Sequence, residues 1–566
     1  MAADLLHIAL DICKGLYSHI LANNKASLLI NNQKCMLLSQ RLFEAQETLQ
    51  TVRRTLEMTG PQSQSTLMGV LLPMQELVHV LRKAEKTVIK DCSGGKKWME
   101  SAVRQGGDWK ETFGEILYDL QWLCSILRKQ VGEDSQVLKR ADCDRTLCET
   151  EINTLLTAAK KDDEDLEDLL RDLQGDHVCS AGGCCRESTS MQCLATQLLK
   201  KLKFQSEFQA WPPTQKKSYH ECLYESKLDN LSAWPFVLSV SMHNLNAGSL
   251  LGKGAYGIVQ EADWLGEPYA IKTCRYGYQE IFKPEIAILS GLHHPHIMHA
   301  VCCAEEKNKC SYIMELMDMT LSQVLENSQL SHVRCVDVML QIAEGINYLH
   351  SMDLVHRDLK PDNILVKRDH PASEDSMSAL REAPLWIAKV SHFGTTKLKM
   401  ESTAYANQTM SIGTTMFMAP EVYELEDGDM KPERFHPKKT DVYSFGLICF
   451  CVLIGEPTPF PPPEVMRSVK AFKRRVRNGR RPQLPPTCPN YLSALIQQCW
   501  DENPENRPDF QTICTELRYI KGCLLTGLDN NLSLQSASAR FPPNPSGGSL
   551  RVFLTMVRAI CILSHA

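Results

Sequence analysis

The segment LVHRDLKPDNILV, residues 354–366, constrains this chain more than any other. It contains three polar residues at short intervals: Asp358, Lys360 and Asn363. In phosphoryl transfer, such a carboxylate orients and deprotonates the acceptor hydroxyl, and such a lysine steadies the transferring group. The amide oxygen of Asn363 suits a metal ion. The segment therefore predicts a loop built for phosphate chemistry, with Asp358 and Lys360 as its catalytic residues.

A glycine-rich run, LGKGAYGIV, spans residues 251–259 and has the form G-x-G-x-x-G-x-V. Alone it is a weak signal, because similar glycines open dinucleotide-binding folds. Lys272 in YAIK follows at a distance that fits a hairpin with a phosphate-pairing lysine on its second strand, which favours a loop that covers ATP. The expected nucleotide contacts are Leu251, Gly252, Gly254, Gly257, Val259, Ala270 and Lys272, with Glu315 and Met317 farther on in SYIMELMDM.

Glu285, in FKPEIAILSG, lies where a helix would present a carboxylate to Lys272. A lone glutamate is otherwise a solvated helix residue, but its distance past the lysine favours the ion pair. Pro284 comes directly before it. Because proline cannot donate the hydrogen bond of a helix interior, this helix is expected to begin late or to be kinked.

Three later motifs complete the pattern: GTTMFMAPE, DVYSFG and CWDENPENRPDF. With them, residues 245–525 resemble a eukaryotic protein-kinase domain. HRDLKPDN and Thr414 look like the serine/threonine type, and DVYSFG with CWDENPENRP is similar to the tyrosine-kinase-like group. The resemblance implies a bilobal fold that binds ATP and Mg²⁺. It also implies that Asp441 braces the catalytic loop and that Arg507 pairs with Glu421.

One motif departs from the family. KVSHFG has His392 where kinases have the aspartate that holds Mg²⁺. Imidazole is a poor Mg²⁺ ligand, so ATP binding should be weakened or less metal-dependent, and phosphoryl transfer strongly slowed. Alternatively, His392 is a satisfied histidine in a pocket that never binds nucleotide. Because Phe393 and Gly394 remain, the segment is still able to switch between two arrangements.

Two segments near His392 suggest regulation. The stretch between Val366 and Ile387 is long and polar, and predicts an exposed loop that is either a tolerated insertion or a functional element. In the activation segment, five hydroxyl residues are candidate modification sites, and phosphate there would pair with cations such as Arg357. These sites are Ser402, Thr403, Tyr405, Thr409 and Ser411.

The N-terminal part has a helical apolar periodicity almost throughout. Residues 1–131 are expected to form a bundle of about four helices, and residues 132–244 a helical brace and linker. A cysteine-rich stretch at 179–193 does not match the usual zinc spacings and is interpreted as a loop. Residues 526–566 are expected to be a disordered tail with a short apolar end. The fold class is therefore α+β: a helical bundle followed by a bilobal kinase-like domain.

Composition excludes several classes of function. A net charge of -5 over 566 residues gives no whole-chain argument for nucleic-acid binding. The 23 cysteines are too sparse for a disulfide scaffold and are expected to be reduced, buried thiols of a cytoplasmic protein. The first residues carry Asp4, Asp11 and Lys14 and have no basic leader, so neither a signal peptide nor a membrane span is expected.

A helical bundle, a brace and a kinase-like domain with an altered metal motif are together similar to the mixed-lineage kinase domain-like proteins. That resemblance implies a pseudokinase that switches a helical domain which oligomerises and permeabilises membranes in cell death. Basic residues of the bundle would meet anionic lipid or simply form a solvated face; they are Lys14, Lys25, Lys34, Arg41, Arg53, Arg54, Arg82, Lys83 and Lys86.

Three interpretations stay open. The first is a largely inactive kinase-fold switch with protein partners or an upstream kinase, forming homo-oligomers and recruited from the cytoplasm to a membrane. The second is an active serine/threonine kinase whose bundle is a targeting module. The third is a scaffold in which neither half does chemistry.

Overall fold

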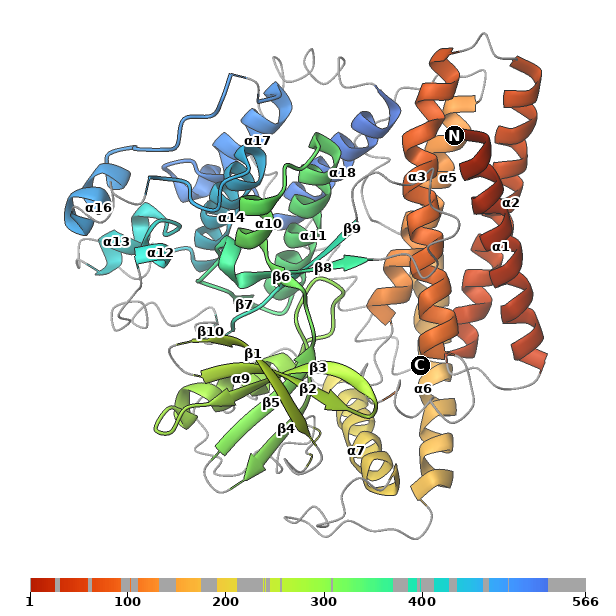
Figure 1. Ribbon diagram of the computed structural model, residues 1–566, viewed down its shortest axis with the longest axis horizontal. Coiled ribbons are helices and arrows are strands. Elements are labelled where there is room, and N and C mark those ends of the chain that lie inside the picture. The colour runs from red at the N-terminus through yellow and green to blue at the C-terminus, as the bar shows by residue number, and fades with distance from the viewer. Residues whose placement is uncertain are drawn as a thin grey trace.

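The computed structural model describes residues 2–25, 31–59, 64–92, 102, 110–131, 149–174, 191–210, 238, 240, 245–254, 257–306, 309–369, 385–393, 397–398, 412–426, 435–461, 468–486 and 488–527. The expected α+β class is confirmed: a helical N-terminal region precedes a domain with an antiparallel sheet and further helices (Figure 1).

The N-terminal bundle is built from α1 (Ala2–Lys25), α2 (Asn32–Thr59), α3 (Gln64–Lys86) and α5 (Lys110–Val131), with a π-helical turn, η1 (Thr87–Cys92), after α3. Helix α1 packs on α2 and α3, and α5 packs on α2 and α3. The apolar stripes read from the sequence face inward: Leu5, Leu16, Leu42, Leu77 and Phe113 are all buried. Burial of these stripes is the main stabilising contribution of the bundle.

Two more helices lie between the bundle and the kinase-like domain. Helix α6 (Glu149–Gln174) packs against α2 and α5, and α7 (Met191–Ala210) packs against α6. Leu194 and Leu198 of α7 belong to the same apolar cluster as Val301 and Ile313 of the kinase-like sheet. The brace therefore contacts the bundle at one end and the smaller lobe at the other (Figure 1).

The smaller lobe is a five-stranded antiparallel sheet in the order β1-β2-β3-β5-β4. Its strands are β1 (Asn246–Lys253), β2 (Gly257–Trp264), β3 (Glu267–Cys274), β4 (Ala300–Glu306) and β5 (Lys309–Glu315). Helix α9 (Gln279–Gly291) contacts β4 and β5. Pro284 lies inside α9 and does not mark its start: five residues of the helix precede it, so its missing N–H removes one bond near the helix N-terminus.

The larger lobe is mostly helical. Its helices are α10 (Leu321–Asn327), α11 (His332–Ser351), η5 (Pro361–Asn363), α12 (Ile412–Thr415), α13 (Pro420–Glu426), α14 (Pro437–Ile454), α16 (Val469–Arg477), α17 (Asn490–Cys499), η9 (Pro504–Asn506) and α18 (Phe510–Thr526). Its strands are β6 (Met319–Thr320), β7 (Leu354–Val355), β8 (Ile364–Asp369), β9 (Leu385–Val390) and β10 (Lys397–Leu398). They form a β6-β8-β9 sheet and a β10-β7 pair next to the catalytic loop.

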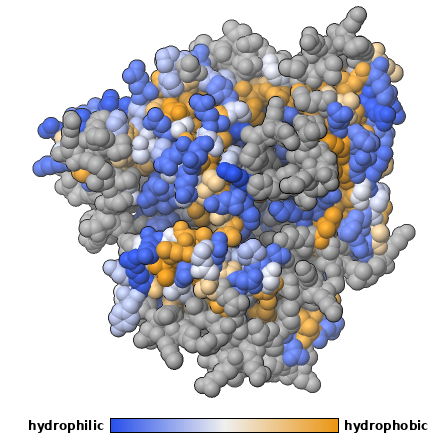
Figure 2. Space-filling view, in the orientation of Figure 1, coloured by the Kyte–Doolittle hydropathy of each residue, from blue (hydrophilic) through white to orange (hydrophobic). Residues whose placement is uncertain are grey.

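The bundle lies beside the larger lobe, and α18 packs against α3 and α5 (Figure 1). On the face in Figure 2, hydrophilic residues flank the hydrophobic band that runs along the bundle. Among the described residues, one helix, α1, is long and apolar enough over Ala2–Asn23 to cross a membrane, with a mean hydropathy of 1.2. The core helix of a soluble bundle has the same composition. The described cysteines are all buried, as expected.

Candidate active site and interdomain contact

Lys272 and Glu285 form the predicted ion pair. The Lys272 Nζ donates to both carboxylate oxygens of Glu285, at 2.7 and 2.9 Å, and joins β3 to α9. Burial would raise the pKa of Glu285, but Lys272, His392 and the hydrogen bond from Tyr312 together lower it. Tyr312 of β5, which sequence reasoning did not single out, donates a hydrogen bond to the same carboxylate at 3.2 Å. The pair is thus charged and fixed in place.

The glycine-rich segment forms the turn between β1 and β2. The Gly254 N–H donates to the Gly257 carbonyl at 2.9 Å. A Cβ at Gly257 would lie 2.6 Å from the Thr273 carbonyl oxygen, whereas a Cβ at Gly252 would meet nothing within 4 Å. Gly257 is therefore required by the close approach of β3, and Gly252 is left beside open space. Leu251 is exposed and Val259 half-buried, and Ala270 lies buried in β3.

The catalytic loop brings its three predicted residues together. Asp358 accepts hydrogen bonds from Asn363 Nδ2 at 2.8 Å and from Lys360 Nζ at 3.2 Å. Thr414, noted in the sequence only as a mark of kinase type, donates to Asp358 at 3.0 Å and accepts from Lys360 at 2.7 Å. Burial would raise the pKa of Asp358, but Lys360 and His392 lower it. Asp358 is thus an ionised carboxylate, available to accept a proton from a bound hydroxyl.

Asp441 braces this loop from α14, as the resemblance implied. Its carboxylate accepts the backbone N–H groups of His356 and Arg357, both at 2.9 Å, and a bond from His350 Nε2 at 2.8 Å. At the far end of the activation segment, Arg507 makes a bidentate pair with Glu421, at 2.6 and 2.9 Å. Both buried carboxylates are therefore satisfied by several donors.

His392 follows β9 and faces Asp358, with 3.6 Å between His392 Nδ1 and Asp358 Oδ2. That separation is too long for a hydrogen bond, and Nδ1 is buried without a hydrogen-bond partner. Burial, and then the positive charge of Lys272, lower the pKa of His392. The next residue, Phe393, is buried, and its ring lies 5.3 Å from that of His356, as expected for the packing role of the motif.

The residues fit a nucleoside triphosphate better than they fit Mg²⁺. Lys272 offers positive charge to phosphates. Asn363 supplies an amide oxygen, but the carboxylate that usually acts as the other protein ligand is replaced by the imidazole of His392, which Mg²⁺ does not favour. Among the described residues, no three His, Cys, Asp or Glu side chains lie together as metal ligands.

The predicted contacts at Glu315 and Met317 lie at the connection between the lobes. Met317 is half-buried and lies two residues after the end of β5. The Glu315 carboxylate pairs with Lys389 at 2.7 Å and Lys367 at 3.3 Å. Burial would raise the pKa of Glu315, but the two lysines lower it to about 2. Its side chain is therefore held by the larger lobe.

Several predicted features lie outside the described residues. These are Gly394, the five candidate modification sites between 402 and 411, most of the polar loop between β8 and β9, the cysteine-rich stretch before Met191, and the C-terminal tail.

A charged contact joins the bundle to the larger lobe, and sequence reasoning missed it. Glu76 of α3 pairs with Arg334 of α11 at 2.8 Å and with Lys521 of α18 at 3.1 Å. Lys521 also pairs with Asp337 of α11 at 2.6 Å. Burial would raise the pKa of Glu76, but Lys521 and Arg334 lower it to about 2. The side chains of Glu76 and Lys521 are only 8% and 12% exposed, so this ion pair is largely shielded from solvent.

A second contact lies along α5. Glu115 accepts a bond from Lys83 at 2.6 Å, and His296, on the segment between α9 and β4, approaches the same carboxylate at 3.4 Å. Next to it, the Arg518 guanidinium of α18 lies 5.2 Å from the ring centroid of Tyr118, within cation–π range. We call these residues, together with Glu76, Arg334, Asp337 and Lys521, the interdomain clamp.

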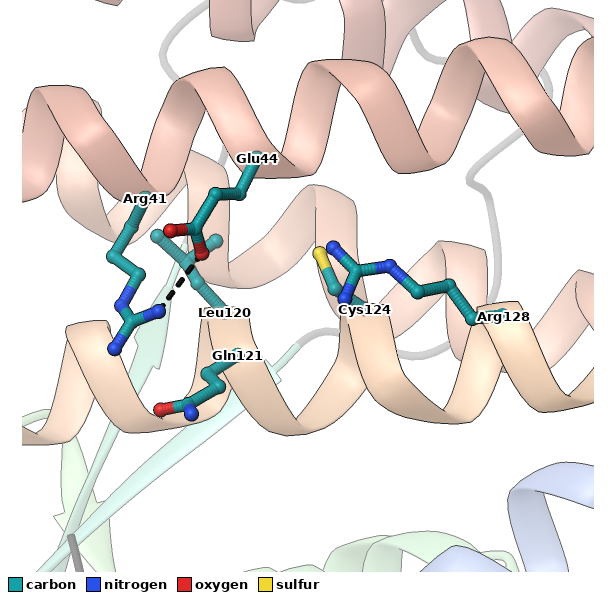
Figure 3. A pocket seen from close by; sticks show the side chains of 6 residues that line it. All are labelled: Arg41, Glu44, Leu120, Gln121, Cys124 and Arg128. Atoms are coloured by element: carbon teal, nitrogen blue, oxygen red, sulfur yellow. Dashed lines mark hydrogen bonds and ion pairs between the residues drawn. The ribbon is translucent and has the colours of Figure 1, made fainter. Parts of the chain in front are cut away.

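A small hollow lies between α2 and α5, within the bundle (Figure 3). Arg41 pairs there with Glu44 at 2.8 Å and also with Glu151 of α6. Burial raises the pKa of the Cys124 thiol to about 11, so it is protonated and not a nucleophile. The hollow is lined by Arg41, Glu44, Leu120, Gln121, Cys124 and Arg128. Its charges join the brace to the bundle.

Comparison with known proteins agrees with the geometry of the cleft. Residues 245–517 match the family of protein tyrosine and serine/threonine kinases. A light-sensor protein kinase of Ceratodon purpureus is 41% identical over 298 residues, which cover 50% of this chain and 22% of that protein. The serine/threonine/tyrosine-protein kinase HT1 of Arabidopsis thaliana is 26% identical over 339 residues, or 54% of this chain and 79% of that protein.

Mitogen-activated protein kinase kinase kinase 10 of Mus musculus is 29% identical over 295 residues, or 50% of this chain and 29% of that protein. The chain spans 12% to 28% of the length of the first three curated relatives that it matches. Residues 245–517 form a protein kinase domain of the serine/threonine/tyrosine type, and its relatives include mitogen-activated kinase kinase kinases.

Proposed function

We propose that the chain is a signalling switch in which a kinase-fold domain restrains the N-terminal helical bundle. The domain binds ATP but transfers phosphoryl groups poorly. On release, the bundle oligomerises and acts at an anionic membrane surface, in cell-death or immune signalling. The protein is cytoplasmic until it is recruited. The observation that carries this proposal is the interdomain clamp, because it ties the bundle directly to α11, which leads into the catalytic loop, and to α18, which packs on α11.

The clamp has the properties that a releasable restraint needs. Its ion pairs are well shielded, so removing one partner leaves a charge without compensation, which costs about 3–5 kcal/mol. Its members lie on rigid helices of both units, so a displacement of α11 or α18 would be transmitted to α3. A switch of this kind requires differential contacts in two states and no catalysis.

The part of the proposal that concerns membrane binding, here called the membrane arm, is supported by basic residues that the bundle already exposes. Lys14 and Arg54 lie on its surface, while Lys34 is buried against Asp162 of α6 at 3.4 Å and Lys83 is engaged by Glu115. Each basic residue near an anionic bilayer contributes about 1 kcal/mol. Separation of the bundle from the brace would add Lys34 to the exposed set, and α1 has the length and composition of a helix that can insert.

The test uses the full chain and vesicles with and without anionic lipid. Lys521→Glu places a negative charge next to the negative charges of Asp337 and Glu76. This repulsion should release the bundle. We expect it to increase leakage of anionic vesicles and to produce higher oligomers, compared with wild type. The double variant Lys521→Glu with Glu76→Lys restores one opposite-charge pair and should reduce leakage. If Lys521→Glu is folded and causes no leakage at any lipid composition, the membrane arm is wrong and the scaffold interpretation is favoured.

An active serine/threonine kinase is the second candidate. The intact Lys272–Glu285 pair and the Asp358, Lys360 and Thr414 cluster favour it, because every protein group of the transfer reaction except the usual metal ligand is in place. A phosphotransfer assay on a generic serine/threonine substrate separates the two. Efficient transfer by wild type that Asp358→Asn abolishes would replace the switch by this second function.

A further inference from the structure

The carboxylate of Glu285 has two donors that come from neighbouring strands. The Tyr312 hydroxyl donates to Glu285 Oε1 at 3.2 Å, and Lys272 Nζ donates to the same oxygen at 2.7 Å. Tyr312 and Lys272 lie directly opposite each other in the ladder between β3 and β5. Side chains at opposite positions of a ladder point to the same face of the sheet, so the register itself brings both donors to one carboxylate of α9.

Two aromatic rings flank the Lys272 ammonium. Its Nζ lies 5.5 Å from the ring centroid of Phe282, on α9, and 5.6 Å from that of Tyr312, both within cation–π range. The centroids of the two rings are 5.4 Å apart. Phe282 and Tyr312 are both buried, so the rings limit how far the ammonium can move. Tyr312 therefore contacts both members of the ion pair, one through its hydroxyl and the other through its ring.

The Tyr312 hydroxyl remains a donor at all pH values at which a protein is ordinarily folded. Burial, and then the negative charge of Glu285, raise the pKa of Tyr312 well above its ordinary value of 10.0, so the hydroxyl stays protonated. Glu285 is ionised, because its pKa lies below the ordinary value. The contact is thus a hydrogen bond from a neutral O–H to a carboxylate, which is stronger than a bond between two neutral groups.

Lys272 and Tyr312 differ in how a nucleotide would affect them. The phosphates of a nucleotide compete with Glu285 for the Lys272 ammonium, because both are negatively charged and the lysine side chain is still 14% exposed. The Tyr312 hydroxyl is neutral and buried, so phosphate charge does not draw it away. Tyr312 is therefore the donor that Glu285 keeps when Lys272 moves toward a phosphate, and a buried carboxylate that lost both donors would be strongly destabilised.

We propose that Tyr312 is a positioning residue of the nucleotide site. It holds Glu285, and with it α9, in place while Lys272 binds the nucleotide phosphates. The inference rests on the nucleotide binding of the proposed function and deepens it. It does not require phosphoryl transfer, so it applies to a switch and to an active kinase alike.

The test compares Tyr312→Phe with wild type in the full chain, because this variant removes the hydroxyl and keeps the ring beside Lys272. We would measure the Kd of a non-hydrolysable ATP analogue and the hydrogen exchange of α9 with and without that analogue. Tyr312→Phe should bind the analogue about tenfold more weakly, since a hydrogen bond to a charged group is worth roughly that factor. At saturation the analogue should speed exchange of α9 in Tyr312→Phe at least about fivefold, and should not speed it in wild type.

Tyr423→Phe is the matched control. Tyr423 is a buried tyrosine of α13 whose hydroxyl donates to the Thr415 carbonyl at 2.5 Å, so the same substitution again removes one buried hydrogen bond. It should lower the melting temperature, but it should leave the analogue Kd unchanged and the exchange of α9 independent of the analogue. A purely structural role for Tyr312 predicts that Tyr312→Phe behaves in the same way as this control.

A second comparison needs no nucleotide. Lys272→Met takes the ammonium away from Glu285, as a phosphate would, and leaves Tyr312 as a donor. Exchange of α9 should be at least about fivefold faster in the double variant Lys272→Met with Tyr312→Phe than in Lys272→Met alone. Thermal melting of each variant establishes that it is folded.

Equal exchange of α9 in Lys272→Met and in the double variant would overturn the positioning role. So would an unchanged analogue Kd in Tyr312→Phe together with exchange of α9 that ignores the analogue, while the nucleotide binding of the proposed function would stand. If the analogue does not bind wild type under any condition, both the positioning role and the proposed nucleotide binding are wrong.

Discussion

Lys521 of α18 and Glu76 of α3 lie 3.1 Å apart and join the last helix of the kinase domain to the middle of the bundle. Glu76→Gln keeps the shape of the side chain and removes its charge, which takes the carboxylate partner from Arg334 and leaves Lys521 paired with Asp337. We expect the free energy of unfolding to fall by about 3 kcal/mol. Glu57→Gln is the matched control, because Glu57 pairs with Arg53 in solvent, and it should change stability by less than about 0.5 kcal/mol. Denaturant unfolding of the full chain measures both.

The same pair makes stability depend on pH. The folded-state pKa of Glu76 is about 2, below the ordinary value of 4.5, so the charged form is favoured by folding. Its contribution is fully present above about pH 4.5 and is lost as pH falls toward 2. Stability measured from pH 6 to pH 3 should therefore decline less steeply in Glu76→Gln than in wild type. Parallel curves for the two proteins would contradict this role for Glu76.

The kinase motifs could be predicted because short, spaced signals carry them. Lys272, Asp358, Asn363, Asp441 and Arg507 each belong to a local pattern whose chemistry requires that residue type. The structure brings them into the expected pairs. The helical bundle could be predicted equally well, because its apolar residues recur at helical spacing.

The interdomain clamp could not be predicted in this way. Glu76, Arg334 and Lys521 are far apart in sequence, and each looks like an ordinary surface charge on an amphipathic helix. Only the packing of α18 against α3 brings them together, and no periodicity encodes that packing. Of the two expectations for Pro284, a late start of α9 is wrong, because the tertiary contacts of α9 with β4 and β5 outweigh the local effect of the proline.

Gly257 and Gly252 belong to the same glycine-rich segment but differ in the space that a Cβ would find, so their substitutions can be compared directly. Gly257→Ala would place a Cβ 2.6 Å from the Thr273 carbonyl oxygen and push β2 away from β3. We expect it to destabilise the chain by about 1–3 kcal/mol and to weaken nucleotide binding. Gly252→Ala meets open space and should leave the melting temperature unchanged. Equal melting temperatures for the two variants would show that β2 and β3 adjust without cost.

Glu421 and Arg507 anchor the end of the activation segment, and their side chains are 4% and 0% exposed. Glu421→Gln leaves the Arg507 charge buried and poorly compensated, so we expect a loss of about 3–5 kcal/mol. Asp353→Asn, which weakens an exposed pair with Lys438, is the control and should cost less than about 1 kcal/mol. Hydrogen exchange of α13 and α14 would locate the effect. Exchange that speeds up equally in both variants would argue against a specific anchor.

His392→Asp tests whether the residue at position 392 limits phosphoryl transfer. Lys272, Glu285 and Asp358 already have their partners, so the variant restores only the missing carboxylate. We expect Mg²⁺-dependent phosphotransfer to rise at least about tenfold, because one well-placed charged ligand is worth more than 1.4 kcal/mol in the transition state. Adding Asp358→Asn to His392→Asp should abolish the gain. If wild type transfers phosphate as fast as His392→Asp, position 392 does not limit catalysis, and the active-kinase interpretation is favoured over the switch.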